Sequence, residues 1–236
     1  MRKINLFVLL LGVVFIYSCG KTNKRKLSND WIVNEMTQET YFESSVKTET
    51  FEQDEEREEE TTVNGDSYVF ETVWNRETST YNPGLDTWNT NKEDGDDRKE
   101  AEVLEFSFSI DKEGNWTKVF HLLFKEDGET TEIMQKESGK WSFVSKSEEF
   151  KKNERVLFNI LESDEKFTVT DEDGNEISSD EAKTYAMGEN TMIYVVVESS
   201  KDELTLSLDE DFKYVFDQGY EIKTLSSVLH MIPAED

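Results

Sequence analysis

Cysteine, proline and histidine are scarce in this chain of 236 residues, which has one cysteine, two prolines and two histidines. A single cysteine excludes a disulfide framework within the chain and cysteine-ligated metal sites. Neither histidine has a nucleophile-elbow sequence beside it, so a Ser-His-Asp triad has no basis in the sequence. We therefore predict a protein without catalytic activity, cofactor or metal centre.

Basic residues are also in the minority. The chain has 26 Lys and Arg against 53 Asp and Glu, which gives a formal net charge of −27. Such a charge repels phosphate backbones, so we expect no nucleic-acid partner. The acidic segment 171–176 lacks the ligand spacing of an EF-hand, and we expect a hairpin turn there. Aromatic residues make up 12% of the chain, which is enough for a folded core.

The single cysteine follows a basic start and an apolar run, residues 6–17, that is too short to span a bilayer. The sequence around it, Ile16-Tyr17-Ser18-Cys19, resembles the lipobox of bacterial lipoproteins. This resemblance implies a signal peptide over residues 1–18, cleavage before Cys19, and acylation of its sulfur and new amino group to anchor the protein in a membrane. The alternative is a secretory leader cut near Ser18, which would leave a soluble protein with a free thiol.

Residues 20–29 are polar and basic without periodicity, as is typical of a tether between a lipid anchor and a domain. Surface-exported lipoproteins of the Bacteroidetes carry an acidic cluster just after the cysteine, whereas residues 21–25 are basic here. This comparison favours the periplasmic face of the outer membrane over the cell surface.

Apolar and polar residues alternate along most of the chain after Asp30. This period of two predicts strands at residues 68–74, 104–110, 116–124, 141–143, 156–160, 167–169 and 204–208. Residues 191–198 are β-branched and are predicted to form a strand buried on both faces. Turn signals with Gly and Asn lie at residues 112–115, 127–128 and 173–175. The pattern predicts one all-β domain over residues 30–236, either an antiparallel up-and-down barrel or a β-sandwich.

Two acidic insertions, near residues 52–66 and 76–100, interrupt the alternation. We expect a mobile loop or a projecting strand end at 52–60 and a long loop at 76–100. In the second loop, Tyr81 and Trp88 would either plug the barrel mouth or form an exposed stacking surface. His121 should point away from the core, and His230 should lie in an edge strand or a docking tail.

Four segments, residues 29–33, 109–116, 138–143 and 202–208, are similar to the lipocalin-like lipoproteins of the Bacteroidetes. In that family a tryptophan on the first strand closes the barrel bottom, which here corresponds to Trp31. Asn29 stands where the family's motif usually has glycine. The resemblance implies a lipocalin-like barrel.

We predict from this resemblance a non-catalytic, membrane-anchored binding module that holds an apolar small molecule or lipid. The alternative is a filled barrel whose loops bind another envelope component, either a protein or a glycan. The candidate ligand-binding residues are aromatic: Trp74, Tyr81, Trp88, Phe106, Phe108 and Phe120.

Overall fold

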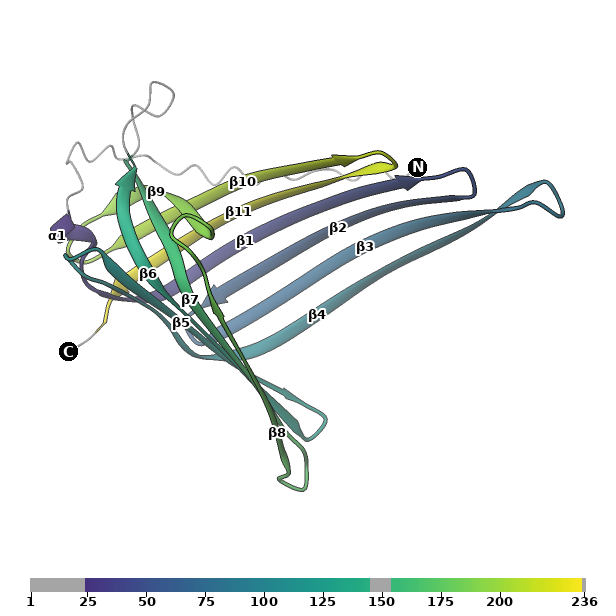
Figure 1. Ribbon diagram of the computed structural model, residues 1–236. Helices are drawn as coiled ribbons and strands as arrows, with labels where there is room; N and C mark the ends of the chain where they lie inside the picture. The colour runs from purple at the N-terminus through teal and green to yellow at the C-terminus, as the bar shows by residue number, and fades with distance from the viewer. Residues whose placement is uncertain (1–23, 145–153, 235–236) are drawn as a thin grey trace.

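A computed structural model describes residues 24–144 and 154–234 of the chain, and strands dominate it (Figure 1). One helix, α1 (Lys24–Leu27), precedes the sheet. The strands are β1 (Asp30–Lys47), β2 (Phe51–Asn64), β3 (Ser67–Asn82), β4 (Thr87–Ile110), β5 (Asn115–Glu126), β6 (Glu129–Val144), β7 (Glu154–Thr170), β8 (Glu176–Thr184), β9 (Thr191–Ser199), β10 (Leu204–Phe216) and β11 (Gly219–Pro233).

The strands close into an antiparallel barrel. Consecutive strands pair from β1 to β7, and β9, β10 and β11 continue the sheet from β7 back to β1, which makes a ring of ten strands. Strand β8 pairs with β7 and lies outside this ring. The predicted barrel is therefore confirmed, and the sandwich alternative is wrong.

Two β-bulges make room for the β2–β3 hairpin between β1 and β4. At one end β1 pairs directly with β4, from Asp30 with Ser109 to Ile32 with Ser107. Register shifts then occur in β1 after Val33 and in β4 after Val103. The turn between β2 and β3 lies between these strands. The amide of Gly65 in this turn donates to the carbonyl of Asn34 in β1 at 2.8 Å. Bulges bend a strand and increase its twist, which lets β1 and β4 separate here.

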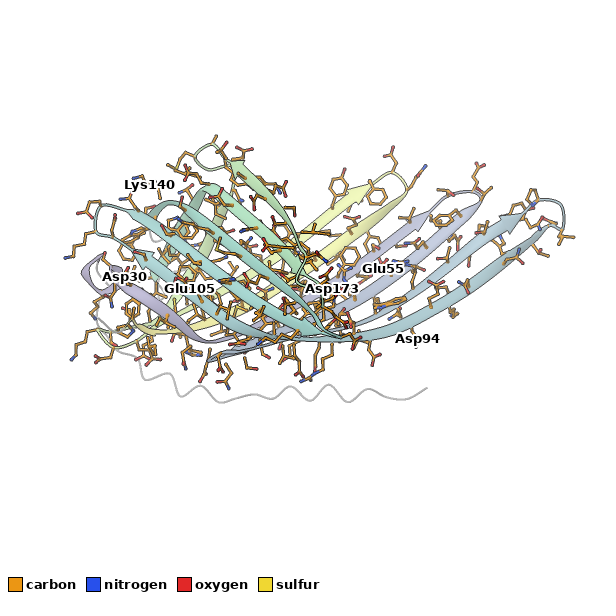
Figure 2. The ribbon with its side chains drawn as sticks, turned by 90° about the horizontal axis from the view of Figure 1, so that it is seen from below. Asp30, Glu55, Asp94, Glu105, Lys140 and Asp173 are labelled. Atoms are coloured by element: carbon orange, nitrogen blue, oxygen red, sulfur yellow. The ribbon has the colours of Figure 1, made fainter. Side chains whose placement is uncertain are left out.

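The closed barrel occupies only part of the strand length. Strand β4 pairs with β5 from Glu102 onward, and β10 pairs with β9 only from Leu204 to Ser207. Beyond these points the sheet divides into two arms that diverge in Figure 1. We call the outer lengths of β10, β11, β1, β2, β3 and β4 the long arm, and those of β5, β6, β7 and β8 the short arm. Figure 2 shows Asp30 and Lys140 at the closed end, and Glu55 and Asp94 on the long arm.

The hydrophobic core lies in the closed part. Buried side chains from nine of the strands meet there, among them Trp31, Val63, Phe108, Trp116, Trp141, Phe158, Tyr194, Leu206 and Met231. The indole nitrogens of the three buried tryptophans donate to backbone carbonyls: Trp31 to Leu27 at 2.9 Å, Trp116 to Asn159 at 3.1 Å, and Trp141 to Asp111 at 2.9 Å. Such bonds satisfy the polar edge of a buried indole. The bond from Trp31 to Leu27 also attaches α1 to the barrel, so part of the expected tether is helical and packed on the domain.

The long loop predicted at residues 76–100 is wrong, and at residues 52–60 the strand alternative holds instead of the mobile loop. Residues 52–60 lie within β2, and residues 76–100 lie in β3 and β4 apart from the turn at residues 83–86. The hydrophobic alternation fails there because these lengths belong to the long arm, where neither face is covered by the core. Two further expectations are wrong. Residues 191–198 are not buried on both faces, since Ile193 is exposed. His230 lies in β11, between β10 and β1, and so not at an edge.

The turn predictions are confirmed. Gly114 and Gly174 adopt positive φ values of 92° and 81°. In each turn the aspartate three residues before the glycine accepts the amide of the following asparagine, Asp111 from Asn115 at 2.7 Å and Asp171 from Asn175 at 2.8 Å. Hydrogen bonds from Asn115 and Asn175 lower the pKa of these carboxyls. The carboxyl of Asp171 thus organises the hairpin turn that was predicted for this acidic segment.

Candidate functional site

The structure divides the predicted site residues into three groups. Phe106, Phe108 and Phe120 contact one another in the closed part, with ring centroids 4.6 Å apart for Phe106 and Phe120 and 6.2 Å apart for Phe106 and Phe108. Phe108 is only 1% exposed. These rings pack with the core, and Phe106 and Phe108 also belong to the lining of a cavity where β1 and β4 separate.

Trp74 lies on the long arm. It faces Gly95 across the β3–β4 pair, and a Cβ added to Gly95 would lie 2.9 Å from the indole. The guanidinium of Arg76 is 5.9 Å from the Trp74 ring. The strand register places Trp74 in a row across the inner face of the arm, the face continuous with the barrel interior: Phe212, Lys223, Phe42, Arg57, Trp74 and Gly95.

Tyr81 and Trp88 lie at the tip of the β3–β4 hairpin. They are directly opposite each other in register, and their ring centroids are 5.6 Å apart. The Tyr81 hydroxyl donates to Asp86, which raises the pKa of that hydroxyl. Trp88 is 42% exposed. The interpretation that these rings plug the barrel mouth is therefore wrong, and the exposed alternative holds.

Cys19 lies outside the described residues. Within residues 24–144 and 154–234, no helix is long and apolar enough to cross a bilayer. In the same ranges, no group of three or more His, Cys, Asp and Glu side chains is arranged to hold a metal ion. His121 faces outward as predicted, with its Nε2 3.5 Å from a carboxylate oxygen of Glu132.

A groove of about 500 Å³ crosses β10, β11, β1, β2 and β3 on the long arm, and sequence reasoning missed it. Eight of its fourteen lining residues are acidic, and none is basic. The acidic residues are Glu39, Glu58, Glu59, Glu60, Glu71, Asp209, Glu210 and Asp211. We call this feature the acidic groove.

Cross-strand register assembles the acidic groove. Asp209 pairs with Ser226, Ser226 with Glu39, Glu39 with Glu60, and Glu60 with Glu71, so that these side chains form one row on the outer face. The signal in the sequence was the charge run 52–60, in which every even-numbered residue is Asp or Glu. In a strand, alternate residues share a face, so the even-numbered residues of this run form one acidic stripe on β2.

One carboxylate beside the groove binds two tyrosines. The Tyr41 hydroxyl donates to Oε2 of Glu43 at 3.1 Å, and the Tyr220 hydroxyl donates to Oε1 of the same residue. Desolvation, the bond to Glu43 and nearby carboxylates raise the pKa of Tyr41 to about 12. The pKa of Tyr220 is also raised, chiefly by its bond to Glu43. Both phenols are therefore neutral donors at physiological pH.

A second cavity, of about 520 Å³, lies where β1 and β4 separate. Its lining includes Ile32 and Leu104, whose side chains are exposed, together with Val103 and the turn residues Gly65 and Asp66. This cavity is more apolar than the acidic groove. We call it the junction cavity.

Comparison of the chain with protein-family models and with curated proteins gave no match. The lipocalin-like lipoprotein resemblance therefore remains a prediction, while the barrel itself rests on the strand pairing.

Proposed function

We propose that the protein is a lipid-anchored, non-catalytic interaction protein of the outer membrane, with a basic protein segment as its partner in the acidic groove. The observation that carries this proposal is the groove itself, whose lining has eight acidic and no basic residues. Strand alternation places six of these carboxylates, all but Glu59 and Glu210, on the outer face, where Glu71 pairs with Arg98. A concave surface lined by one sign of charge attracts the opposite charge and accelerates its association.

The packing of the barrel supports this function over storage of a ligand inside it. Phe106, Phe108 and Phe120 pack against one another and the core, so an apolar molecule would have to displace them. Densely packed interiors resist such displacement. The long arm, in contrast, presents its acidic groove and the hairpin tip with Trp88 to solvent.

Charge exchange in the groove tests the proposal. The full-length chain carrying Glu58→Lys and Glu60→Lys is compared with one carrying Glu176→Lys and Glu181→Lys in β8, which changes the net charge equally but outside the groove. The probe is a fluorescent Lys-rich peptide, and binding is measured by anisotropy at several salt concentrations. We expect the groove variant to lose at least roughly tenfold in affinity, and the β8 variant to lose less. Equal losses would show that net charge alone attracts the peptide.

The junction cavity supports the second candidate, binding of an apolar small molecule or lipid. Ile32 and Leu104 give it an exposed apolar lining beside the core residues Trp31, Val33, Phe106 and Phe108. Native mass spectrometry of protein purified from its own host would detect a retained molecule. If the cavity is the site, Leu104→Asp should abolish retention and Leu85→Asp, at the exposed β3–β4 turn, should not.

A further inference from the structure

Strand β10 has an exposed edge along most of its length. Residues 204–216 pair with β11 on one side, whereas pairing with β9 ends at Ser207. Among the residues that the structure describes, no strand pairs with the other side of residues 208–216. The backbone groups along such an edge are available to another strand.

The outer part of this edge carries large apolar and aromatic side chains at positions 212 and 214–216. Phe212 is 54% exposed and Tyr214 is 65% exposed, and Val215 is exposed between Tyr214 and Phe216. The rings of Tyr214 and Phe216 are 5.8 Å apart on the inner face. Exposed edges with such residues are sites of strand addition.

The other two long edges lack aromatic side chains. Eight of the nine residues from 92 to 100, along the β4 edge, are charged, and the ninth is Gly95. Charged side chains at an edge oppose pairing with another chain. Strand β8 has as many charged residues as residues 208–216, three acidic and one lysine, but Ile177 is its one large apolar residue. Within the described part of the protein, the β10 edge therefore stands apart through its aromatic residues.

We propose that two copies of the protein pair through β10, antiparallel and around a twofold axis at Phe212. In this register, residues 208–216 of one copy span the same nine residues of the other. Phe212 lies opposite itself, Asp211 lies opposite Lys213 of the second copy, and Leu208 lies opposite Phe216. Opposite charges at directly facing positions stabilise an antiparallel pair.

Charge selects this register over its neighbours. A twofold axis perpendicular to the sheet must pass through one residue, because paired residues share a face. An axis at Asp209, Glu210, Asp211 or Lys213 would place that charge opposite itself. An axis at Tyr214 would place Asp211 opposite Asp217 of the second copy. The axis at Phe212 gives two opposite-charge pairs within β10 and no facing like charges. An axis at Asp211 would also place Asp209 opposite Lys213, but it would place Asp211 opposite itself. An axis at Val215 would pair Lys213 only with Asp217, which lies beyond the end of β10.

Cysteine substitution measures the register directly. In a strand pair centred at Phe212, the two Cα atoms of Phe212→Cys would be about 4.5–5.5 Å apart, within reach of a disulfide. The matched control, Tyr214→Cys, lies on the same face but would be offset from its counterpart by four residues, or about 14 Å. The full-length chain with its native Cys19 provides the background. We expect mild oxidation to cross-link the Phe212→Cys protein at least roughly tenfold faster than either comparison protein.

A charge swap provides an independent measurement that does not use thiols. Asp211→Lys and Lys213→Asp each convert two attractive pairs into repulsive ones, so each should weaken dimerisation roughly tenfold in sedimentation equilibrium. The double variant restores opposite charges and should recover the wild-type value. Circular dichroism checks that all variants are folded.

Equal cross-linking of the Phe212→Cys and Tyr214→Cys proteins would overturn the proposal. A double variant that dimerises as weakly as the single variants would also overturn it. Asp211 also lines the acidic groove, whereas Phe212 and Lys213 do not. The Phe212→Cys cross-link and the Lys213→Asp variant therefore test the dimer separately from peptide binding in the groove.

Discussion

Glu43 shows how one side chain sets the titration of its neighbours. Its carboxylate accepts both the Tyr41 and the Tyr220 hydroxyls, and the pKa of each phenol is raised. A raised tyrosine pKa stabilises the fold below the unfolded value near 10, and this stabilisation is lost as pH rises toward the folded value of about 12 for Tyr41. The loss of stability should therefore appear in alkaline solution.

Glu43→Gln should lower the pKa of both tyrosines, because the amide removes the negative charge that opposes ionisation. Spectrophotometric titration of tyrosinate would then show two groups ionising at lower pH than in wild type. Glu172→Gln, in the exposed turn at residues 171–175, removes the same charge elsewhere and should leave this titration unchanged. Identical curves for Glu43→Gln and wild type would refute the assignment.

The backbones of β6 and β7 approach so closely at position 139 that only glycine fits there. It stands at the register shift between β6 and β7, and an added Cβ would lie 1.9 Å from the carbonyl oxygen of Asn159. We predict that Gly139→Ala lowers the free energy of unfolding by about 1–3 kcal/mol, because β6 and β7 must move apart. Gly84→Ala is the control, since its Cβ would lie at an ordinary 3.4 Å from its nearest neighbour. Denaturant unfolding of Gly139→Ala and Gly84→Ala measures the two free energies of unfolding. Equal unfolding midpoints for the two variants would contradict the prediction.

At the scale of single elements, the tip of the β3–β4 hairpin depends on one aromatic pair. Tyr81 and Trp88 face each other far from the core, so their contact chiefly holds the ends of two long strands together. Such pairs contribute about 0.5–1.5 kcal/mol. We expect Trp88→Ala to accelerate amide hydrogen exchange near the tip and to leave exchange in the closed part unchanged. Acceleration spread evenly over the sheet would mean that the tip is coupled to global unfolding.

Strands were predictable where one face meets the core and not where both faces meet solvent. Phe106 and Phe108 alternate with polar residues because their strand borders the barrel interior, and this length of β4 was predicted. The outer length of the same strand, residues 87–100, carries charges on both faces and falls within the long loop predicted at residues 76–100. The acidic groove escaped prediction for the same reason. Its residues come from five strands, and only the cross-strand register brings Asp209 and Glu71 onto one surface.

For the whole molecule, the closed part and the long arm divide the physical roles. The closed part contains the core, including Trp31, and begins directly after α1, so it lies next to the proposed tether. The long arm carries the acidic groove and the β10 edge, each with exposed side chains. A membrane anchor near α1 would leave the arm as the part that extends from the lipid surface. Membrane attachment and partner binding should thus be separable by mutation.

Cys19→Ala tests the anchor. The alanine has no thiol to receive a diacylglycerol group, so neither acylation nor lipoprotein-type cleavage should occur. Wild-type protein should partition into detergent and incorporate a palmitate analogue in its host, and the Cys19→Ala protein should not incorporate it. The charge of −27 gives the chain no electrostatic attraction to anionic leaflets. The variant should therefore stay with membranes only through its uncut leader, which mass spectrometry of the intact chain would identify.

Glu58→Lys with Glu60→Lys should still incorporate the analogue, because the groove is separate from the anchor. Palmitate labelling that persists in Cys19→Ala would show that the protein is not a lipoprotein anchored through this residue.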